Sequence, residues 1–224
     1  MNHRTVRSFV LREGRLTAAQ QQALVELWPR FGVPFSGDVL DLAVLFGRSA
    51  PCTLEIGFGN GEHLLARARA EAERNFMGVE VHRPGIGQLL RACAAANLTN
   101  LRVIAHDAVE VLHAQIAIGA LDEVQILFPD PWPKKRHHKR RLIQPDFATL
   151  VALRLRPGGW LRLATDWAPY AEHMRAVLES CPLLAPAAGA AAAADPAGRM
   201  ATRFERRGLR LGHVVCELGY RRCA

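Results

Sequence analysis

The feature that most constrains this chain is a regular alternation, beginning at Cys52, of short apolar runs with segments that suit helices. The apolar runs cover residues 53–56, 76–81, 101–105, 124–128 and 160–165. The helix-compatible segments cover residues 62–71, 85–96, 108–118, 145–155 and 167–179. A Pro-Gly-Gly sequence at 157–159 predicts a tight turn before the last of these strands. Because strands and helices that alternate at these lengths form βαβ units, we expect an α/β fold with a mostly parallel sheet and helices on both faces.

The two ends of the chain depart from this alternation. Residues 1–50 form a mixed, basic N-terminal extension, which we expect to pack on or near a larger domain at 51–224. Within it, residues 17–27 predict a short helix with Thr17 as its N-cap. Residues 185–198 are rich in alanine, and their Pro and Gly residues favour a mobile connector. Two strand-like runs, 200–206 and 211–220, predict a closing C-terminal hairpin, so the expected sheet has seven strands.

The composition limits the classes of binding partner and the cellular compartments that suit this chain. Half of the 224 residues are apolar, and Lys and Arg outnumber Asp and Glu by 29 to 21, so the net charge of +8 favours an anionic partner, nucleic acid or a membrane surface. The five cysteines are scattered without a CxxC pair, which argues against a disulfide framework or a zinc site and fits a reducing compartment. No signal region and no run of about 18 apolar residues is present, so we expect a soluble cytoplasmic protein. We expect no metal, because no acid or cysteine stands at ligand spacing from His137 and His138.

A glycine loop follows the first predicted strand in the sequence LEIGFGNGEH. Its glycines are Gly57, Gly59 and Gly61. Glycines at these positions let the backbone turn sharply and approach a ligand. A dinucleotide fingerprint would read GxGxxG, but here Glu62 stands where that motif has its third glycine. The loop also carries Glu55 and no basic residue except His63, so it favours a cationic, phosphate-free nucleoside such as S-adenosylmethionine over NAD.

Acids follow four successive predicted strands. Glu55 belongs to the first, and Glu80, 25 residues later, ends the second, where nucleotide-binding sheets place an acid for the ribose hydroxyls. Asp107 follows the third strand and Asp130 the fourth. A single acid after a strand is usually a helix N-cap or a solvated loop residue. Because ligands of such sheets bind beyond the carboxyl ends of the strands, acids after four strands indicate one crevice.

A dense basic cluster follows the fourth acid, in the sequence FPDPWPKKRHHKRR at 128–141. Asp130 lies in a proline-stiffened turn, and six of the eight residues at 134–141 are Lys or Arg. The arrangement suggests a site that acts on one atom of a polyanion, with the basic run holding phosphates and the acid at the reacting centre. Two roles stay open for Trp132, stacking on a base and packing within the protein.

The chain resembles the bacterial tRNA (guanine-N7-)-methyltransferases. The resemblance rests on segments spread in order over almost the whole chain: RSFVLREGRLT, LEIGFGNGEHLL, FMGVEVH, HDAVEVL, FPDPWPKKRHHKRRL, LRLATDW and TRFERRGLRLGH. The combination of FPDPWPKKRHHKRR with TDW and TRFE is its most specific part. The resemblance implies a Rossmann-like class I methyltransferase that uses S-adenosylmethionine to methylate N7 of the variable-loop guanine, position 46, of tRNA. The chain departs from the family most in its alanine-rich residues 185–198.

Site residues follow from the same resemblance, position by position. The implied S-adenosylmethionine contacts are Glu55, Glu80, Asp107 and Asp130, and Asp130 is also the implied catalytic acid. The loop glycines Gly57, Gly59 and Gly61 are expected to lie against the same donor. The implied tRNA contacts are Lys134, Arg136, His137, His138, Lys139, Arg140, Arg141, Asp166, Thr202, Arg203, Phe204 and Glu205. No metal is implied.

The chemistry assigns Asp130 an electrostatic role. Guanine N7 carries a lone pair and no proton, so an in-line transfer from a sulfonium to this nitrogen needs no strong base. A preorganised carboxylate stabilises the positive charge that appears on the purine, and Asp166 would help to hold the guanine edge.

Other functions compete with this interpretation. An acid-proline-aromatic motif after the fourth strand also suits methyl transfer to an amino group, and an RNA-binding module without catalysis is a further alternative. The missing third glycine disfavours a nicotinamide oxidoreductase. The sequence leaves open whether the protein is a monomer or a homodimer.

Overall fold

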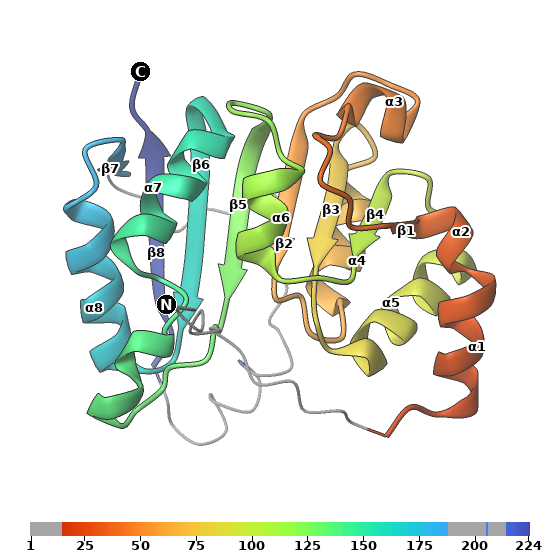
Figure 1. Cartoon of the computed structure of the whole chain (residues 1–224), viewed down its shortest axis with the longest axis horizontal. Coiled ribbons are helices and arrows are strands. Elements are labelled where there is room, and N and C mark those ends of the chain that lie inside the picture. The colour runs from red at the N-terminus through yellow and green to blue at the C-terminus, as the bar shows by residue number, and fades with distance from the viewer. Residues whose placement is uncertain (1–14, 188–204, 206–213) are drawn as a thin grey trace.

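A computed structural model describes residues 15–187, 205 and 214–224 of the chain (Figure 1). The helices among them are α1 (Ala18–Glu26), α2 (Trp28–Phe31), α3 (Leu42–Phe46), α4 (Glu62–Ala70), α5 (Arg83–Ala95), α6 (Ala108–Ala114), the 3-10 helix η1 (Lys135–Arg140), α7 (Pro145–Arg154) and α8 (Ala168–Glu179). The strands are β1 (Gly32–Val33), β2 (Cys52–Ile56), β3 (Asn75–Val79), β4 (Leu101–Ile104), β5 (Leu121–Leu127), β6 (Leu155–Thr165), β7 (Leu184–Pro186) and β8 (Cys216–Arg222).

The strands form one sheet in the order β1-β4-β3-β2-β5-β6-β8-β7. Strands β1 to β6 pair in parallel, and β8 lies antiparallel between β6 and β7. The predicted α/β fold, with a mostly parallel sheet and a C-terminal antiparallel hairpin, is confirmed. Strand β2 has β3 on one side and β5 on the other, so the chain leaves β2 in one direction and later returns to the opposite side. A crevice at such a switch point is where open α/β sheets bind their ligands.

Within the described residues the sheet already has eight strands, against the predicted seven. The additional strand is β1, which pairs with β4 at the edge of the sheet. Its two residues are too few to show a strand period in the sequence, so only the pairing reveals it.

The hairpin also differs from the prediction. On the side away from β6, β8 pairs with β7, whose residues 185 and 186 fall in the expected alanine-rich connector. Ala187 also donates a backbone hydrogen bond of 2.9 Å to the Gly219 carbonyl. Pro186 is tolerated because β7 is an edge strand. Of residues 200–206 the structure describes Glu205 alone, and there the backbone is helical.

The predicted turn at 157–159 lies within β6 instead of before it. Leu121 of β5 pairs with Leu155, whereas Glu123 pairs with Trp160, so the intervening residues form a bulge in β6. Gly158 has a φ of +73°, a left-handed backbone conformation that residues other than glycine rarely adopt. The Pro-Gly-Gly sequence therefore bends a strand that starts earlier than predicted.

Two apolar layers enclose the sheet. Residues of α6, α7 and α8 pack with β2, β5, β6 and β8 on one face, and residues of α1, α2, α4 and α5 pack with β3 and β4 on the other. Every residue of β2 and β3 is buried, as expected for parallel strands covered on both faces. These layers hold the carboxyl ends of the central strands in fixed positions.

Part of the predicted N-terminal extension is packed against the sheet domain. Thr17 caps α1 as predicted, in a capping box with Gln20. The Gln20 amide also donates a hydrogen bond of 3.1 Å to the Pro84 carbonyl at the start of α5. A Cβ at Gly87 would meet the Gln20 carbonyl oxygen at 2.8 Å, so the glycine permits this close approach. The division of the chain at residue 50 stays a prediction, and residues 1–14 lie outside the described residues.

Candidate active site

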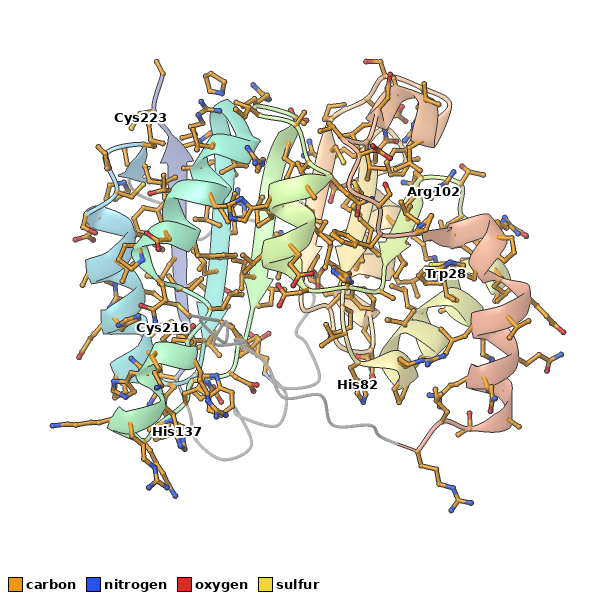
Figure 2. The ribbon with its side chains drawn as sticks, in the orientation of Figure 1. Trp28, His82, Arg102, His137, Cys216 and Cys223 are labelled. Carbon is orange, nitrogen blue, oxygen red and sulfur yellow. The ribbon has the colours of Figure 1, made fainter. Side chains whose placement is uncertain are left out.

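The predicted acids meet at one edge of the sheet. Because β2, β3, β4 and β5 are parallel, their carboxyl ends lie together, at the lower side of Figure 1. Glu55 is the fourth residue of β2, Glu80 follows β3, Asp107 precedes α6 and Asp130 follows β5. Figure 2 labels His82 and His137 at this lower side, and Arg102 and Cys223 toward the opposite one.

The glycine loop exposes bare backbone to this edge. Gly57, Gly59 and Gly61 have φ values of +73°, +58° and +74°, which explains why the loop needs glycine at each position. A Cβ built at Gly57 or Gly59 meets nothing within 4 Å, so open space borders the loop there. On its other side the loop is tightly packed, because a Cβ at Gly85 of α5 would lie 2.0 Å from the Gly59 carbonyl oxygen.

Three backbone amides fix the Glu80 carboxylate. Its Oε2 accepts a hydrogen bond of 2.8 Å from Gly59, and its Oε1 accepts bonds of 2.7 and 3.0 Å from Val81 and His82. A carboxylate has about four lone-pair sites, so a further hydroxyl can still be accepted. Glu80 therefore joins the glycine loop to the end of β3 while remaining able to bind a ligand.

Glu55 is buried and contacts a histidine that the sequence analysis did not select. His63 Nδ1 lies 2.9 Å from Glu55 Oε2, and both side chains are almost fully buried. The glycine loop turns so sharply that the first turn of α4 lies over the end of β2. A separation of eight residues matches neither a helix nor a strand period, so no local signal predicted this pair.

Asp107 is the N-cap of α6. Its Oδ1 accepts a hydrogen bond of 2.8 Å from the Val109 amide. The structural role that a single acid after a strand usually has is therefore present here. Its position at the carboxyl end of β4 also leaves it on the edge shared with Glu80.

The loop that carries Asp130 is strained. Phe128 and Trp132 have φ values of +53° and +44°, and non-glycine residues in this region cost about 1–3 kcal/mol each. Strain of this kind persists only where the surroundings hold it. The Phe128 amide is tied to the Ala164 carbonyl of β6 at 2.8 Å, and Asp130 lies exposed between the two strained residues.

The basic run folds back on this loop as η1, and its side chains divide into two groups. Lys134, Lys135, Arg136 and Lys139 are exposed, whereas His137, His138 and Arg140 are half-buried and Arg141 is buried. The Trp132 ring lies 5.8 Å from the His137 ring and 5.1 Å from the Arg140 guanidinium. Trp132 thus packs against the basic run. Loss of solvent and the charges of the neighbouring Arg136, Arg140 and Lys134 lower the pKa of His137.

The remaining predicted site residues are only partly described. Asp166 is half-buried and directly follows β6, the neighbour of β5, so it reaches the same edge as Asp130. Glu205 is buried. Thr202, Arg203 and Phe204 lie outside the described residues.

The edge suits S-adenosylmethionine. A sulfonium nucleoside needs carboxylates for its hydroxyls and its positive charge and an open backbone beside it. The edge offers Glu80 and Asp107 beside the open side of the glycine loop, whereas the Glu55 carboxylate is almost fully buried against His63. Among the described residues, no group of three or more His, Cys, Asp or Glu side chains could hold a metal ion. Within the same residues, no helix is both long and apolar enough to cross a membrane.

Known proteins resemble this chain along almost its full length. A family model described as "Putative methyltransferase" matches residues 49–218. A tRNA (guanine-N(7)-)-methyltransferase of Leifsonia xyli subsp. xyli is 55% identical over 216 residues, which cover 96% of this chain and 95% of that protein. One of Alkalilimnicola ehrlichii is 56% identical over 221 residues, covering 98% and 93%.

A solved structure shares the fold at much lower identity. The 16S rRNA methyltransferase KamB superposes with a TM-score of 0.54 at 14% identity, over 94% of this chain and 96% of that one. With the parallel sheet, the glycine loop and the strand-end acids in place, this likeness supports the class I methyltransferase fold. Because the relatives are more than half identical over nearly the whole chain, the chain belongs to the tRNA (guanine-N7-)-methyltransferase family.

Proposed function

We propose that the protein transfers the methyl group of S-adenosylmethionine to N7 of the variable-loop guanine of tRNA, forming 7-methylguanosine. The observation that carries the proposal is the position of Asp130. It follows β5, the neighbour of the β2 strand that leads into the glycine loop, at the switch point of the sheet, and it lies four residues before the first exposed cation of the basic run, Lys134.

The donor would be held by the residues at the ends of β2, β3 and β4. Glu80, already fixed by three amides, would accept a ribose hydroxyl, and the exposed backbone at Gly57 and Gly59 would lie against the donor. Glu55 and Asp107 would complete the donor site. When bound, S-adenosylmethionine supplies a methyl group on a positively charged sulfur.

Asp130 would orient the acceptor and stabilise its charge. Guanine N7 has no proton to lose, so the carboxylate does not act as a base. Positive charge appears on the purine during transfer, and a carboxylate held by a strained loop is a preorganised counter-charge for it. Asp166, at the end of the neighbouring strand, would help to hold the guanine edge.

The basic run would bring the guanine to this acid. N7 lies in the major groove, which is deep and narrow in A-form RNA, so the target must lie in a loop or be displaced from the stack. We propose that the exposed Lys134, Lys135, Arg136 and Lys139 hold the RNA backbone around it, with the half-buried His137, His138 and Arg140 beneath them. Roles for Thr202, Arg203, Phe204 and Glu205 in tRNA binding stay predictions. All five cysteines are free, and we place the reaction in the cytoplasm on that ground.

Glu80→Ala is expected to raise the KM for S-adenosylmethionine by about 10- to 100-fold, since hydrogen bonds to a charged group contribute about 1.5–3 kcal/mol. The KM for tRNA should change little. Initial rates over a matrix of both substrate concentrations would measure the two constants, with the exposed Glu73→Ala as the control. Equal increases in both constants would argue against a ribose contact.

Replacing Lys135, Arg136 and Lys139 together by Gln is expected to weaken tRNA binding and to flatten its salt dependence. The slope of log Kd against log salt should fall by about one for each lost phosphate contact. Binding titrations at several salt concentrations would measure this slope. Arg69→Gln is the matched control, because Arg69 is an exposed cation at the C-terminal end of α4, away from the glycine loop. An unchanged slope would place the RNA-binding surface elsewhere.

The proposed function is tested by incubating the protein with labelled S-adenosylmethionine and unmodified tRNA and mapping the methylated nucleotide. Label at N7 of the variable-loop guanine is the expected result. Label on an exocyclic amino group, or tRNA that stays unlabelled although the donor binds, would overturn the proposal in favour of one of the two alternatives above.

A further inference from the structure

We infer that Arg141 is a positioning residue, which holds the loop that carries Asp130, and that it does not contact the RNA backbone. The inference rests on the proposed function of this site. It separates Arg141 from the exposed cations of the same run, with which the sequence groups it.

The Arg141 side chain is directed into the protein. Its residue is only 4% exposed, and its Nε donates a hydrogen bond of 3.0 Å to the carbonyl of Pro131, the residue after Asp130. Its Nη2 lies 3.1 Å from Nε2 of His138. These contacts hold the guanidinium in a buried position. A phosphate of the RNA could reach it there only by displacing the loop.

An aromatic ring supports the guanidinium from the other side. The Arg141 Cζ lies 4.9 Å from the centre of the Tyr170 ring, within the range of a cation–π contact. Tyr170 is fully buried in α8, and its hydroxyl lies 3.4 Å from the Ile143 amide. Burial raises the pKa of Tyr170 to about 12, so the ring stays neutral at physiological pH. The contact therefore connects the loop to a rigid helix of the core.

The strained loop needs such a support. The left-handed conformations of Phe128 and Trp132 lie on either side of Asp130. The hydrogen bond from Phe128 to Ala164 fixes the loop upstream of Asp130, and the hydrogen bond from Arg141 to Pro131 fixes it downstream. With both in place, the backbone of Asp130 is held between two anchors.

The neighbouring residues of η1 and its C-cap Arg141 have different contacts. In a 3-10 helix, residues three apart lie on the same side. Arg136 and Lys139 form an exposed pair, His137 and Arg140 lie over Trp132, and His138 contacts Arg141. One side of the turn can thus bind RNA while the other fixes the catalytic loop.

The test compares Arg141→Gln with Lys139→Gln, a variant of the exposed side of the same turn. Arg141→Gln is expected to lower kcat by about 10- to 100-fold, since a small misplacement of a reacting group can cost that much. Its KM for tRNA and its salt slope should stay near those of the wild type. Lys139→Gln should instead keep its kcat, with a higher KM for tRNA and a weaker dependence of tRNA binding on salt concentration. Arg69→Gln serves as the control for both.

A second pair of measurements guards against loss of the fold. Arg141→Lys keeps the charge but lacks the planar fork, so we expect a folded protein whose kcat is several-fold below that of the wild type. Millimolar guanidinium should restore part of the kcat of Arg141→Ala. Trypsin should cleave within residues 134–140 faster in Arg141→Gln than in the wild type, a readout that needs no tRNA.

Three results would overturn the inference. The first is an Arg141→Gln variant whose tRNA binding depends less on salt while its kcat is unchanged. The second is an Arg141→Lys variant with the kcat of the wild type. The third is a lower donor affinity together with a lower Tm in both of these variants. Absence of methyl transfer by the wild type would instead refute the proposed function, and the trypsin comparison would still decide whether Arg141 holds this segment.

Discussion

Asp130→Ala is expected to lower kcat for methyl transfer by about 10²–10³-fold, the usual effect of removing one preorganised electrostatic group. Donor affinity should fall far less, because Glu80 and the glycine loop stay in place. Asp130 is exposed, so the thermal unfolding midpoint should change little. Single-turnover rates with saturating enzyme and labelled donor would measure the chemical step directly.

Asp130→Asn separates charge from shape in the same experiment. The amide has the size of the carboxylate but cannot neutralise the positive charge on the purine, so its rate should lie close to that of the alanine variant. Asp38→Ala, an exposed acid in the loop before α3, serves as the control. Near-normal turnover by Asp130→Ala would falsify the catalytic role of Asp130. Normal turnover by Asp130→Asn alone would mean that Asp130 orients the guanine and that its negative charge is not needed.

Gly85→Ala is expected to weaken S-adenosylmethionine binding by about five- to 100-fold. The added Cβ would lie 2.0 Å from the carbonyl oxygen and 2.8 Å from the carbonyl carbon of Gly59, so the glycine loop must move. Overpacking of this kind costs about 1–3 kcal/mol, and each 1.4 kcal/mol is about tenfold in Kd. Alanine favours a helix over glycine by about 1 kcal/mol, but this gain is the same with and without the donor and so does not restore donor affinity. Calorimetric titration with the donor would measure Kd.

Gly37→Ala is the matched control for this prediction. A Cβ at Gly37 meets nothing within 4 Å, and its φ lies outside the left-handed region. Donor affinity should therefore be that of the wild type. If Gly85→Ala binds the donor equally well, the glycine loop does not form the donor site in the way proposed here.

Much of the fold could be predicted from the sequence. The five central strands and the helices between them appear within a few residues of the expected ranges, because each strand is a local apolar run and each helix lies in a helix-compatible segment between two such runs. The acids could be predicted for the same reason, since a parallel sheet brings the carboxyl ends of its strands to one edge. Thr17 as the N-cap of α1 was equally local, since the capping box needs only Thr17 and Gln20.

The features that were not predicted depend on contacts between distant segments. Strand β1 and the pairing of β7 with β8 rest on main-chain hydrogen bonds across the sheet, which the side-chain pattern does not encode. The contact between Glu55 and His63 depends on how the glycine loop folds back on β2.

The sequence by itself determined the parallel sheet, the edge at which its acids gather and the presence of a basic run after Asp130. Only the tertiary structure decided which cations of that run face solvent. Lys139 and Arg141 are both cations of one basic run, but Arg141, the C-cap of η1, contacts the Pro131 carbonyl and the Tyr170 ring. A buried guanidinium must find such partners, whereas an exposed ammonium stays hydrated, and this difference in solvation separates the two roles.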